Sequence, residues 1–275
     1  MKPSNRSNQS PLISESMLRK LIIFENDDII VVNKPGWLVC HPSKNGPWSS
    51  LVGAIRELCG LESAYLVGRL DRETSGVVLI GKNKAVGRKW QKDLEEKRVK
   101  RSYFAILEGC LSEQVEINNF IGNDPESKVF VKQRVTAKTH KSKQAETLLL
   151  PLYSNSIYTL VCVLTKTGRK HQIRLHAQSI GFPLVGEKLY GHDESYYLKF
   201  CENGWDSSWL SKLGMERQAL HARRFGYFGD ELLFEASLPN DFLNFMENKM
   251  EFKKAYLSDL IERSNSWELR QLNID

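Results

Sequence analysis

The stretch GRLDRETSGVVLIGK, residues 68–82, decides how this chain is interpreted. Its second half spells G-x4-G-K, which is close to a loop that cradles nucleotide phosphates. Its first half places one carboxylate, Asp71, between the guanidinium groups of Arg69 and Arg72. The two halves imply different classes of protein, so only one of them can be the functional motif.

The phosphate-loop interpretation disagrees with two features of the stretch. That motif needs Ser or Thr directly after its Lys to hold magnesium, whereas Asn83 follows Lys82 here. Its variable residues should form a tight loop whose amides face the phosphates. Residues 77–80 are instead Val-Val-Leu-Ile, a run typical of a buried strand. We therefore expect a strand and no nucleotide site.

The carboxylate interpretation agrees better with the sequence. Asp71 follows the segment 65–70 and precedes the small polar run 73–76, which predicts a loop beside a strand. Arg69 and Arg72 should lower the pKa of the Asp71 carboxyl group, because a nearby positive charge favours the ionised form. Such an Asp can act as a nucleophile or stabilise charge. On spacing alone, a surface Asp in an Arg-rich loop explains the pattern as well.

The composition is that of a globular protein, with 275 residues, 41% hydrophobic and 26% charged. A net charge of +6 favours an acidic partner, and nucleic acid is the usual one. The five cysteines are dispersed without a Cys-x2-Cys pair, which indicates reduced thiols and a cytoplasmic protein. His171 and His176 are not spaced for one helical face, so we expect no metal site. No apolar run approaches the roughly 18 residues that span a bilayer.

Strands and helices alternate along the chain without a repeat. The predicted strands are 29–33, 76–80, 103–107, 129–137, 145–150, 157–164, 218–225 and 231–238. The predicted helices are 48–59, 85–98, 169–179 and one that begins near Asp241. This order predicts an α+β fold, a single domain built on a mixed, mostly antiparallel sheet flanked by helices.

The ends of the chain and one internal segment differ in character from the rest. Residues 1–16 are polar and serine-rich and are expected to be a flexible leader. Residues 17–249 form the expected domain, and 250–275 form a charged, amphipathic tail that we predict to be helical. Residues 192–217 mix aromatic with polar residues and are predicted to be an elaborated loop.

The stretch 68–82 resembles the signature loop of the RluA-type pseudouridine synthases, roughly His-Arg-Leu-Asp-x-x-Thr-Ser-Gly before an apolar strand and Lys. Gly68 stands where this family commonly has His, although sister families use Gly there. Further segments similar to family landmarks follow in order. They are 29–36 (IIVVNKPG) with His41-Pro42, 100–105 (KRSYFA) with Glu108-Gly109, 121–125 (IGNDP), 143–147 (KQAET), 167–176 (TGRKHQIRLH), Gly181-x-Pro183, 186–191 and 220–222 (LHA).

The resemblance implies the pseudouridine synthase fold and an isomerase. Such an enzyme converts specific uridines of structured ribosomal or transfer RNA into pseudouridine and needs no cofactor. It assigns Asp71 as the catalytic carboxylate and Tyr103 as the active-site Tyr beside the uracil. It also assigns Arg174 as the Arg that pairs with Asp71, a contact that would keep the carboxylate charged.

The resemblance further implies RNA contacts. The target base must be flipped out to reach a pocket, and Arg69 is then expected to fill the vacated stack. The remaining candidate RNA-binding residues are Arg72, Lys82, Lys100, Arg169 and His171. Lysines and arginines also concentrate over 84–101 and 132–143, where phosphate contacts would give affinity without sequence choice.

An inactive RNA-binding or RNA-folding protein on the same fold is the alternative. A pure binder would need none of Asp71, Tyr103 and Arg174, so their joint presence favours the enzyme. The first landmark begins near residue 21, which we expect to leave no room for the N-terminal S4-type RNA-binding domain of many relatives. We expect a monomer that has RNA as its partner and no contact with a membrane.

Overall fold

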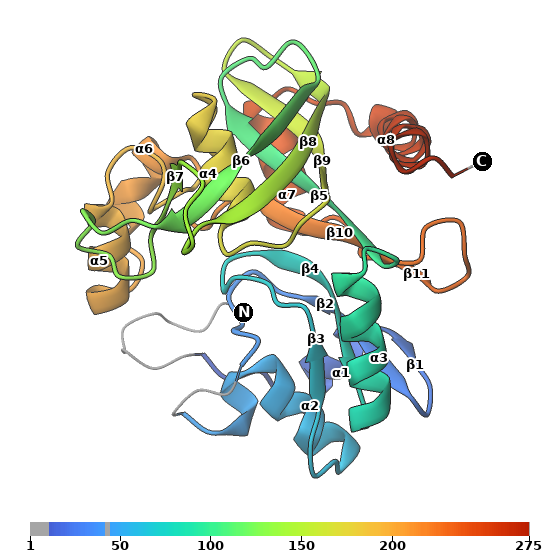
Figure 1. The fold of residues 1–275 in the computed structure, drawn as a ribbon. Helices are drawn as coiled ribbons and strands as arrows, with labels where there is room; N and C mark the ends of the chain where they lie inside the picture. The colour runs from blue at the N-terminus through green and yellow to red at the C-terminus, as the bar shows by residue number, and fades with distance from the viewer. Residues whose placement is uncertain (1–10, 42–44, 275) are drawn as a thin grey trace. The chain divides into compact units, whose positions relative to one another are not determined.

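The computed structural model describes residues 11–41 and 45–274. The chain divides into two compact units, each of which combines strands and helices (Figure 1). Unit 1 comprises Met1–Arg101 and His221–Pro239, and unit 2 comprises Ser102–Leu220 and Asn240–Asp275. The predicted α+β fold, with a mixed and mostly antiparallel sheet flanked by helices, is confirmed.

The sheet of unit 1 has the order β1-β2-β4-β10. Its strands are β1 (Ile22–Glu25), β2 (Ile29–Lys34), β3 (Tyr65–Val67), β4 (Ser75–Gly81), β10 (Leu220–Gly226) and β11 (Leu233–Glu235). β2 lies antiparallel to β4 along one edge, and β3 and β10 share the other edge of β4. The β4–β10 pair is parallel. All seven residues of β4 are buried, which explains its unbroken apolar run.

The helices of unit 1 begin and end where the sequence supplies caps. They are α1 (Glu15–Leu21), η1 (Pro47–Ser49), α2 (Leu51–Cys59) and α3 (Lys84–Glu95). Ser50 accepts the N–H of Gly53 to begin α2, and the left-handed Gly60 ends it. The predicted helix 85–98 is confirmed as α3, whose Trp90 is 5% exposed and packs against Phe225 and Phe234.

The sheet of unit 2 is antiparallel throughout, in the order β5-β9-β8-β6-β7. Its strands are β5 (Lys100–Glu108), β6 (Val115–Asn123), β7 (Gln133–Thr136), β8 (Lys143–Ser154) and β9 (Tyr158–Thr165). The helices of this unit are α4 (Gln172–Ser179), α5 (Ser195–Asn203), η2 (Ser207–Trp209), α6 (Leu210–Leu213), α7 (Asn240–Lys249), η3 (Lys254–Tyr256) and α8 (Leu257–Leu272).

Four sequence-based expectations need correction. The predicted strand 231–238 is limited to β11, because a turn precedes Leu233 and the residues after Glu235 are irregular. The predicted loop 192–217 contains the helices α5 and α6. The sequence of α5 shows no apolar stripe, because none of its residues is buried. The predicted strand 129–137 is limited to β7, because the residues before Gln133 form a turn. The predicted leader ends earlier than residue 16, since Ile13 is 2% exposed and α1 begins at Glu15.

Two of the sequence-based interpretations fall on residues that the structure does not describe. These are the first ten residues of the expected leader and Pro42 of the first landmark. In the described ranges, every helix is too short or too polar to cross a membrane.

Candidate active-site residues

Asp71 lies on the loop between β3 and β4 of unit 1, as its flanking residues predict, and is half-buried. Its carbonyl accepts the N–H of Thr74 at 3.1 Å, which closes a tight turn after the carboxylate. On the N-terminal side, Leu70 is 8% exposed and anchors the loop in the core. The carboxylate is therefore carried by a short segment that is fixed at both ends.

Lys34, at the end of β2, forms hydrogen bonds that fix the same loop. Its side chain is fully buried, and its ammonium group donates to the carbonyls of Pro35 at 2.9 Å, Leu38 at 2.8 Å and Arg72 at 3.1 Å. A buried charge is stable only when such hydrogen bonds replace its water. The carbonyl directly after Asp71 is thus fixed by a charge-assisted bond.

The start of β4 is fixed by a close backbone approach. Gly76 has φ +115°, and a Cβ atom there would lie 2.0 Å from the carbonyl oxygen of Ala222 in β10. The hydroxyl of the neighbouring Ser75 meets Nδ1 of His221 at 2.9 Å, and Nε2 of His221 lies 3.2 Å from the carbonyl of Ala236. Only glycine fits at position 76, which explains the Thr-Ser-Gly sequence.

Four of the candidate RNA-binding residues belong to unit 1, which includes the first two residues of β5. Arg69 is exposed and makes no hydrogen bond or ion pair within the described ranges. Arg72 donates through Nε to the carbonyl of Trp37 at 3.3 Å. Lys82 forms an ion pair with Glu25 at 2.6 Å. The pKa of Lys100 is lowered by burial and by the neighbouring charge of Lys97. Arg69 is therefore the candidate whose charge is most available to a ligand.

Arg174 lies on α4 in unit 2 and is 4% exposed. Its Nε and Nη2 groups donate to the two carboxylate oxygens of Glu187, at 2.8 Å and 2.6 Å. Burial alone would raise the pKa of the Glu187 carboxyl group, but Arg174 and the N–H of Leu189 hold it below its usual value. Glu187 is thus an ionised, buried carboxylate that fixes the plane of the guanidinium group.

A hydroxyl bridge connects the start of α4 to β7. Tyr190 Oη accepts the N–H of Gln133 at 2.9 Å and lies 2.8 Å from Nδ1 of His171, to which it can donate. His171 itself adopts φ +55° immediately before α4. The guanidinium carbon of Arg174 lies over the ring of Tyr190, 5.2 Å from the centre of the ring. Arg169 donates through Nε to the carbonyl of Gln144 at 2.8 Å.

Tyr103 lies in β5 opposite Val163 of β9 and is 6% exposed. The structure therefore brings Arg174, His171 and Arg169 together at the start of α4, and describes Tyr103 in the same unit. Asp71 is described in unit 1 with the other candidates.

The basic surfaces predicted from the sequence differ in how many charges are already paired. On α3 and the turn after it, Arg98 pairs with Asp93 and Glu96, whereas Arg88 and Lys89 are exposed and make no ion pair within the described part of the chain. Sequence reasoning missed Glu187 as the ion-pair partner of Arg174, although it lies in the landmark 186–191. Its role depends on which cation it faces, which spacing does not reveal.

Comparison with solved structures shows which proteins share this fold. Two human structures, described as RNA Pseudouridylate Synthase Domain Containing 4 and Domain Containing 1, share this fold with a TM-score of 0.66 each and 22% sequence identity. The first likeness covers 85% of this chain and 94% of the human chain, and the second covers 96% and 97%. The fold is thus that of the pseudouridine synthases.

Sequence comparison then identifies the family. The model of the RNA pseudouridylate synthase family matches residues 28–179. The chain is 34% identical to "Ribosomal large subunit pseudouridine synthase D" of Neisseria meningitidis over 80% of its own length and 58% of that relative's length. It is 32% identical to the RNA pseudouridine synthase YlyB of Bacillus subtilis, over 82% of this chain and 72% of that protein. This chain belongs to the RNA pseudouridylate synthase family.

Proposed function

We propose that this protein is an RNA pseudouridine synthase, an isomerase that converts specific uridines of structured ribosomal or transfer RNA into pseudouridine. The observation that carries the proposal is the family match over residues 28–179, which include Asp71, Tyr103 and Arg174. Large-subunit ribosomal RNA is the first substrate to test, because the Neisseria relative is named for it.

The reaction balances without an added group. The bond between C1′ of the ribose and N1 of uracil breaks, the base turns within the site, and a bond forms between C1′ and C5. N1 gains a proton and C5 loses one. A protein that performs this step must hold a reactive carboxylate, retain the free base and move one proton.

Asp71 is the proposed catalytic carboxylate. The hydrogen bonds from Lys34 and Thr74 around its loop support this role, because a catalytic group must keep its position when the substrate moves. We assign Arg174 as the cation that keeps Asp71 ionised. The two hydrogen bonds from Arg174 to Glu187 support that assignment. They fix one edge of the planar guanidinium group, and this fixes the direction in which its other edge points. Tyr103 would stack on the uracil and assist proton transfer.

The substrate nucleotide would be flipped out of its stack, and Arg69 would occupy the gap. Its exposure and lack of an ion pair within the described ranges support this role. Arg72, Lys82, Lys100, Arg169 and His171 are proposed to face the RNA backbone around it. We further propose that both units form one catalytic domain over 17–249, and that the protein is a cytoplasmic monomer.

Pseudouridine mapping in the source organism tests the proposal. Cells that lack the protein are compared with cells that carry the wild type, Asp71→Asn, or the exposed-acid control Asp27→Asn. One or a few sites should vanish in the deletion and return with the wild type and Asp27→Asn, but not with Asp71→Asn. Restoration of every site by Asp71→Asn would instead favour the inactive RNA-binding alternative.

A further inference from the structure

Phe130 is the most exposed large apolar side chain among the described residues, at 91% of its maximal area. It lies in the turn between β6 and β7, residues 124–132 of unit 2. Its neighbour Val129 is 4% exposed and packs with Tyr190 and Leu189 in a core cluster. The chain therefore buries one apolar residue and presents the next one to solvent.

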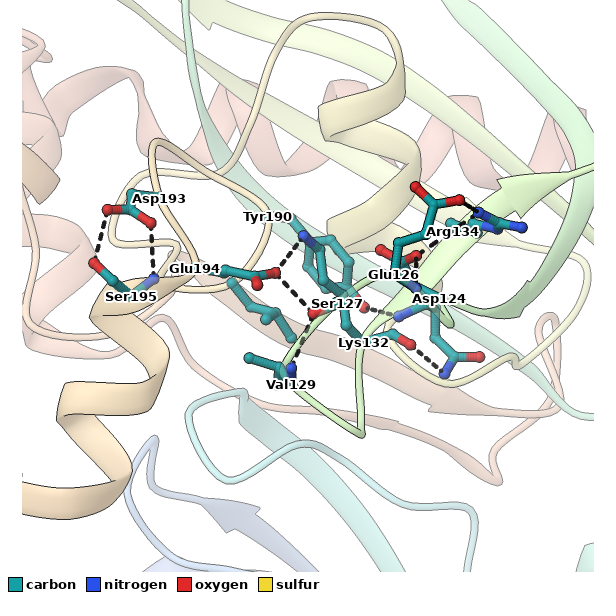
Figure 2. Close-up of polar contacts among 12 residues, drawn as sticks. Asp124, Glu126, Ser127, Val129, Lys132, Arg134, Tyr190, Asp193, Glu194 and Ser195 are labelled. Carbon is teal, nitrogen blue, oxygen red and sulfur yellow. Dashed lines mark hydrogen bonds and ion pairs between the residues drawn. The ribbon is translucent and has the colours of Figure 1, made fainter.

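The turn that carries Phe130 is held in place by Glu194, just before α5 (Figure 2). The carboxylate of Glu194 accepts Ser127 Oγ at 2.8 Å and Lys132 Nζ at 2.7 Å. Ser127 Oγ in turn accepts the N–H of Val129 at 3.0 Å. These hydrogen bonds, chiefly that of Lys132, lower the pKa of Glu194, so the carboxylate stays charged and the clamp holds at neutral pH.

The base of the same turn is closed by further contacts. The N–H of Asp124 donates to the carbonyl of Lys132 at 3.1 Å, and Arg134 pairs with Glu126 at 2.8 Å (Figure 2). The exposure of Phe130 is thus a property of an ordered turn. An aromatic ring presented in this way loses little conformational entropy on binding, because its support is already fixed.

The charges around the turn favour a polyanion. The acidic groups at the turn are already paired with cations. Glu126 and Asp124 pair with Arg134, and Glu194 pairs with Lys132. The unpaired charges are cationic. Among the described residues, these exposed ammonium groups make no hydrogen bond or ion pair: Lys128, Lys138, Lys141 and Lys143.

The last three of these lysines lie on the connection from β7 to β8, whose segment 136–143 contains no Asp or Glu. Its turn is ordered by Ser142, whose Oγ accepts the N–H of Thr139 at 2.7 Å and donates to the carbonyl of Ala137. Strand β7 separates this connection from the Phe130 turn. β7 has four residues, or about 13 Å of extended chain. One short strand of RNA can therefore reach both.

We propose that Phe130 stacks on an unpaired base of the substrate RNA while Lys138, Lys141 and Lys143 contact the flanking phosphates. An exposed aromatic ring beside unpaired cations is the composition that binds single-stranded nucleic acid. An apolar protein partner would need a larger apolar patch than one ring among lysines. The inference rests on the proposed function and adds to it that unit 2 binds unpaired nucleotides outside the reacting uridine.

Site-specific photocrosslinking of the full chain in cells tests the contact directly. A benzophenone amino acid replaces Phe130, or, as a control, Ile157, which is 56% exposed in the β8–β9 turn of the same unit. We expect crosslinks to RNA from position 130 and few from position 157. Crosslinks from position 130 to protein alone, or RNA crosslinks of equal yield at both positions, would overturn the proposal.

Binding of the purified chain to oligouridine, and to the duplex of oligouridine with oligoadenosine, separates stacking from general charge. Phe130→Ala and Phe130→Leu should weaken binding of the single strand about fivefold to a hundredfold, whereas Phe130→Trp should retain it. Duplex binding should change little. Equal affinities for all four proteins, or equal losses for Leu and Trp, would reject the stacking role.

These experiments distinguish a failure of the stacking inference from a failure of the proposed catalytic role of Asp71. If Asp71-dependent pseudouridine forms while the Phe130 variants bind and crosslink like the wild type, only the stacking inference is rejected. If Phe130 crosslinks to RNA but Asp71→Asn retains full pseudouridine formation, the RNA contact stands and the assignment of Asp71 is rejected.

Discussion

Two buried charges fix the segments that carry the candidate catalytic residues. Lys34 is fully buried and donates to three carbonyls around the Asp71 loop. Glu187 is 2% exposed and binds Arg174 and the N–H of Leu189. Neither charge is exposed to the solvent, so the contribution of each depends on a complete set of partners.

Replacing Glu187 by Ala should lower the free energy of unfolding by about 3–5 kcal/mol, because the charge of Arg174 stays buried without this partner. The exposed pair of Arg19 and Glu15, whose side chains are 60% and 56% exposed, provides the control. Glu15→Ala should cost about 0–1 kcal/mol. Urea unfolding measures both, and equal costs would show that the Glu187 contact contributes no more than a surface pair.

Sequence reasoning succeeded where a residue's surroundings along the chain define it, and failed where distant contacts do. Asp71 was expected on a loop before a buried strand, and it lies there. The motif predicted Asp71 as the partner of Arg174, whereas the structure shows Arg174 bound to Glu187, thirteen residues further along the chain. Phe130 stands in Val-Phe-Val, a pattern that predicts a strand. Its exposure depends on Glu194, which local pattern does not reveal.

Among the elements, α4 is attached to the sheet of unit 2 by a buried imidazole. His176 is fully buried, with Nδ1 2.9 Å from Thr147 Oγ1 on β8 and Nε2 2.9 Å from Asn119 Oδ1 on β6. The amide oxygen only accepts, so Nε2 carries the proton and Nδ1 accepts from the hydroxyl. Burial lowers the pKa of His176 to about 4, which keeps the ring neutral.

This contact predicts a pH dependence of stability. The unfolded chain binds a proton on His176 near its ordinary pKa of 6.5, whereas the folded chain does so only near about 4. The stabilisation is complete above pH 6.5 and is lost as the pH falls toward 4. Between pH about 7 and about 5 the wild type should lose about 2 kcal/mol. Urea unfolding of His176→Gln should show a smaller loss, and the exposed control His140→Gln an unchanged one.

The elements themselves were predictable in proportion to their burial. α3 and β4 were expected close to their observed bounds because their apolar residues follow one period. β6 was not predicted, since its buried residues Ile117 and Ile121 are separated by polar ones such as Asn118 and Asn119. α5 has no buried residue, so its sequence shows no apolar stripe.

At the scale of the whole molecule, both units are discontinuous in sequence. Unit 1 takes His221–Pro239 from a late part of the chain, and unit 2 takes Asn240–Asp275 after that return. The start of β4, which follows the Asp71 loop in unit 1, therefore contacts a late segment of the chain, as in the close approach of Gly76 to Ala222.

Substitution of Gly76 tests this contact. Gly76→Ala should destabilise the protein by about 2–5 kcal/mol, because it combines a disfavoured φ with a collision against the backbone of β10. Gly60 is the matched control, since it also has a positive φ, +61°, but has nothing within 4 Å of the added Cβ. Gly60→Ala should cost about 1–2 kcal/mol. Midpoints of urea unfolding that shift equally would contradict the packing argument.

The late return of the chain to unit 1 has a consequence for synthesis on the ribosome. Asp71 is translated 150 residues before His221 (221 − 71 = 150). At roughly 5–20 residues per second, about 8–30 seconds pass before the strand that packs against Gly76 exists. During that interval the nascent chain carries the carboxylate on a segment without its β10 support. The Asp71 loop is thus made early and its β10 support late, so a partly translated chain has not yet acquired the geometry proposed for catalysis.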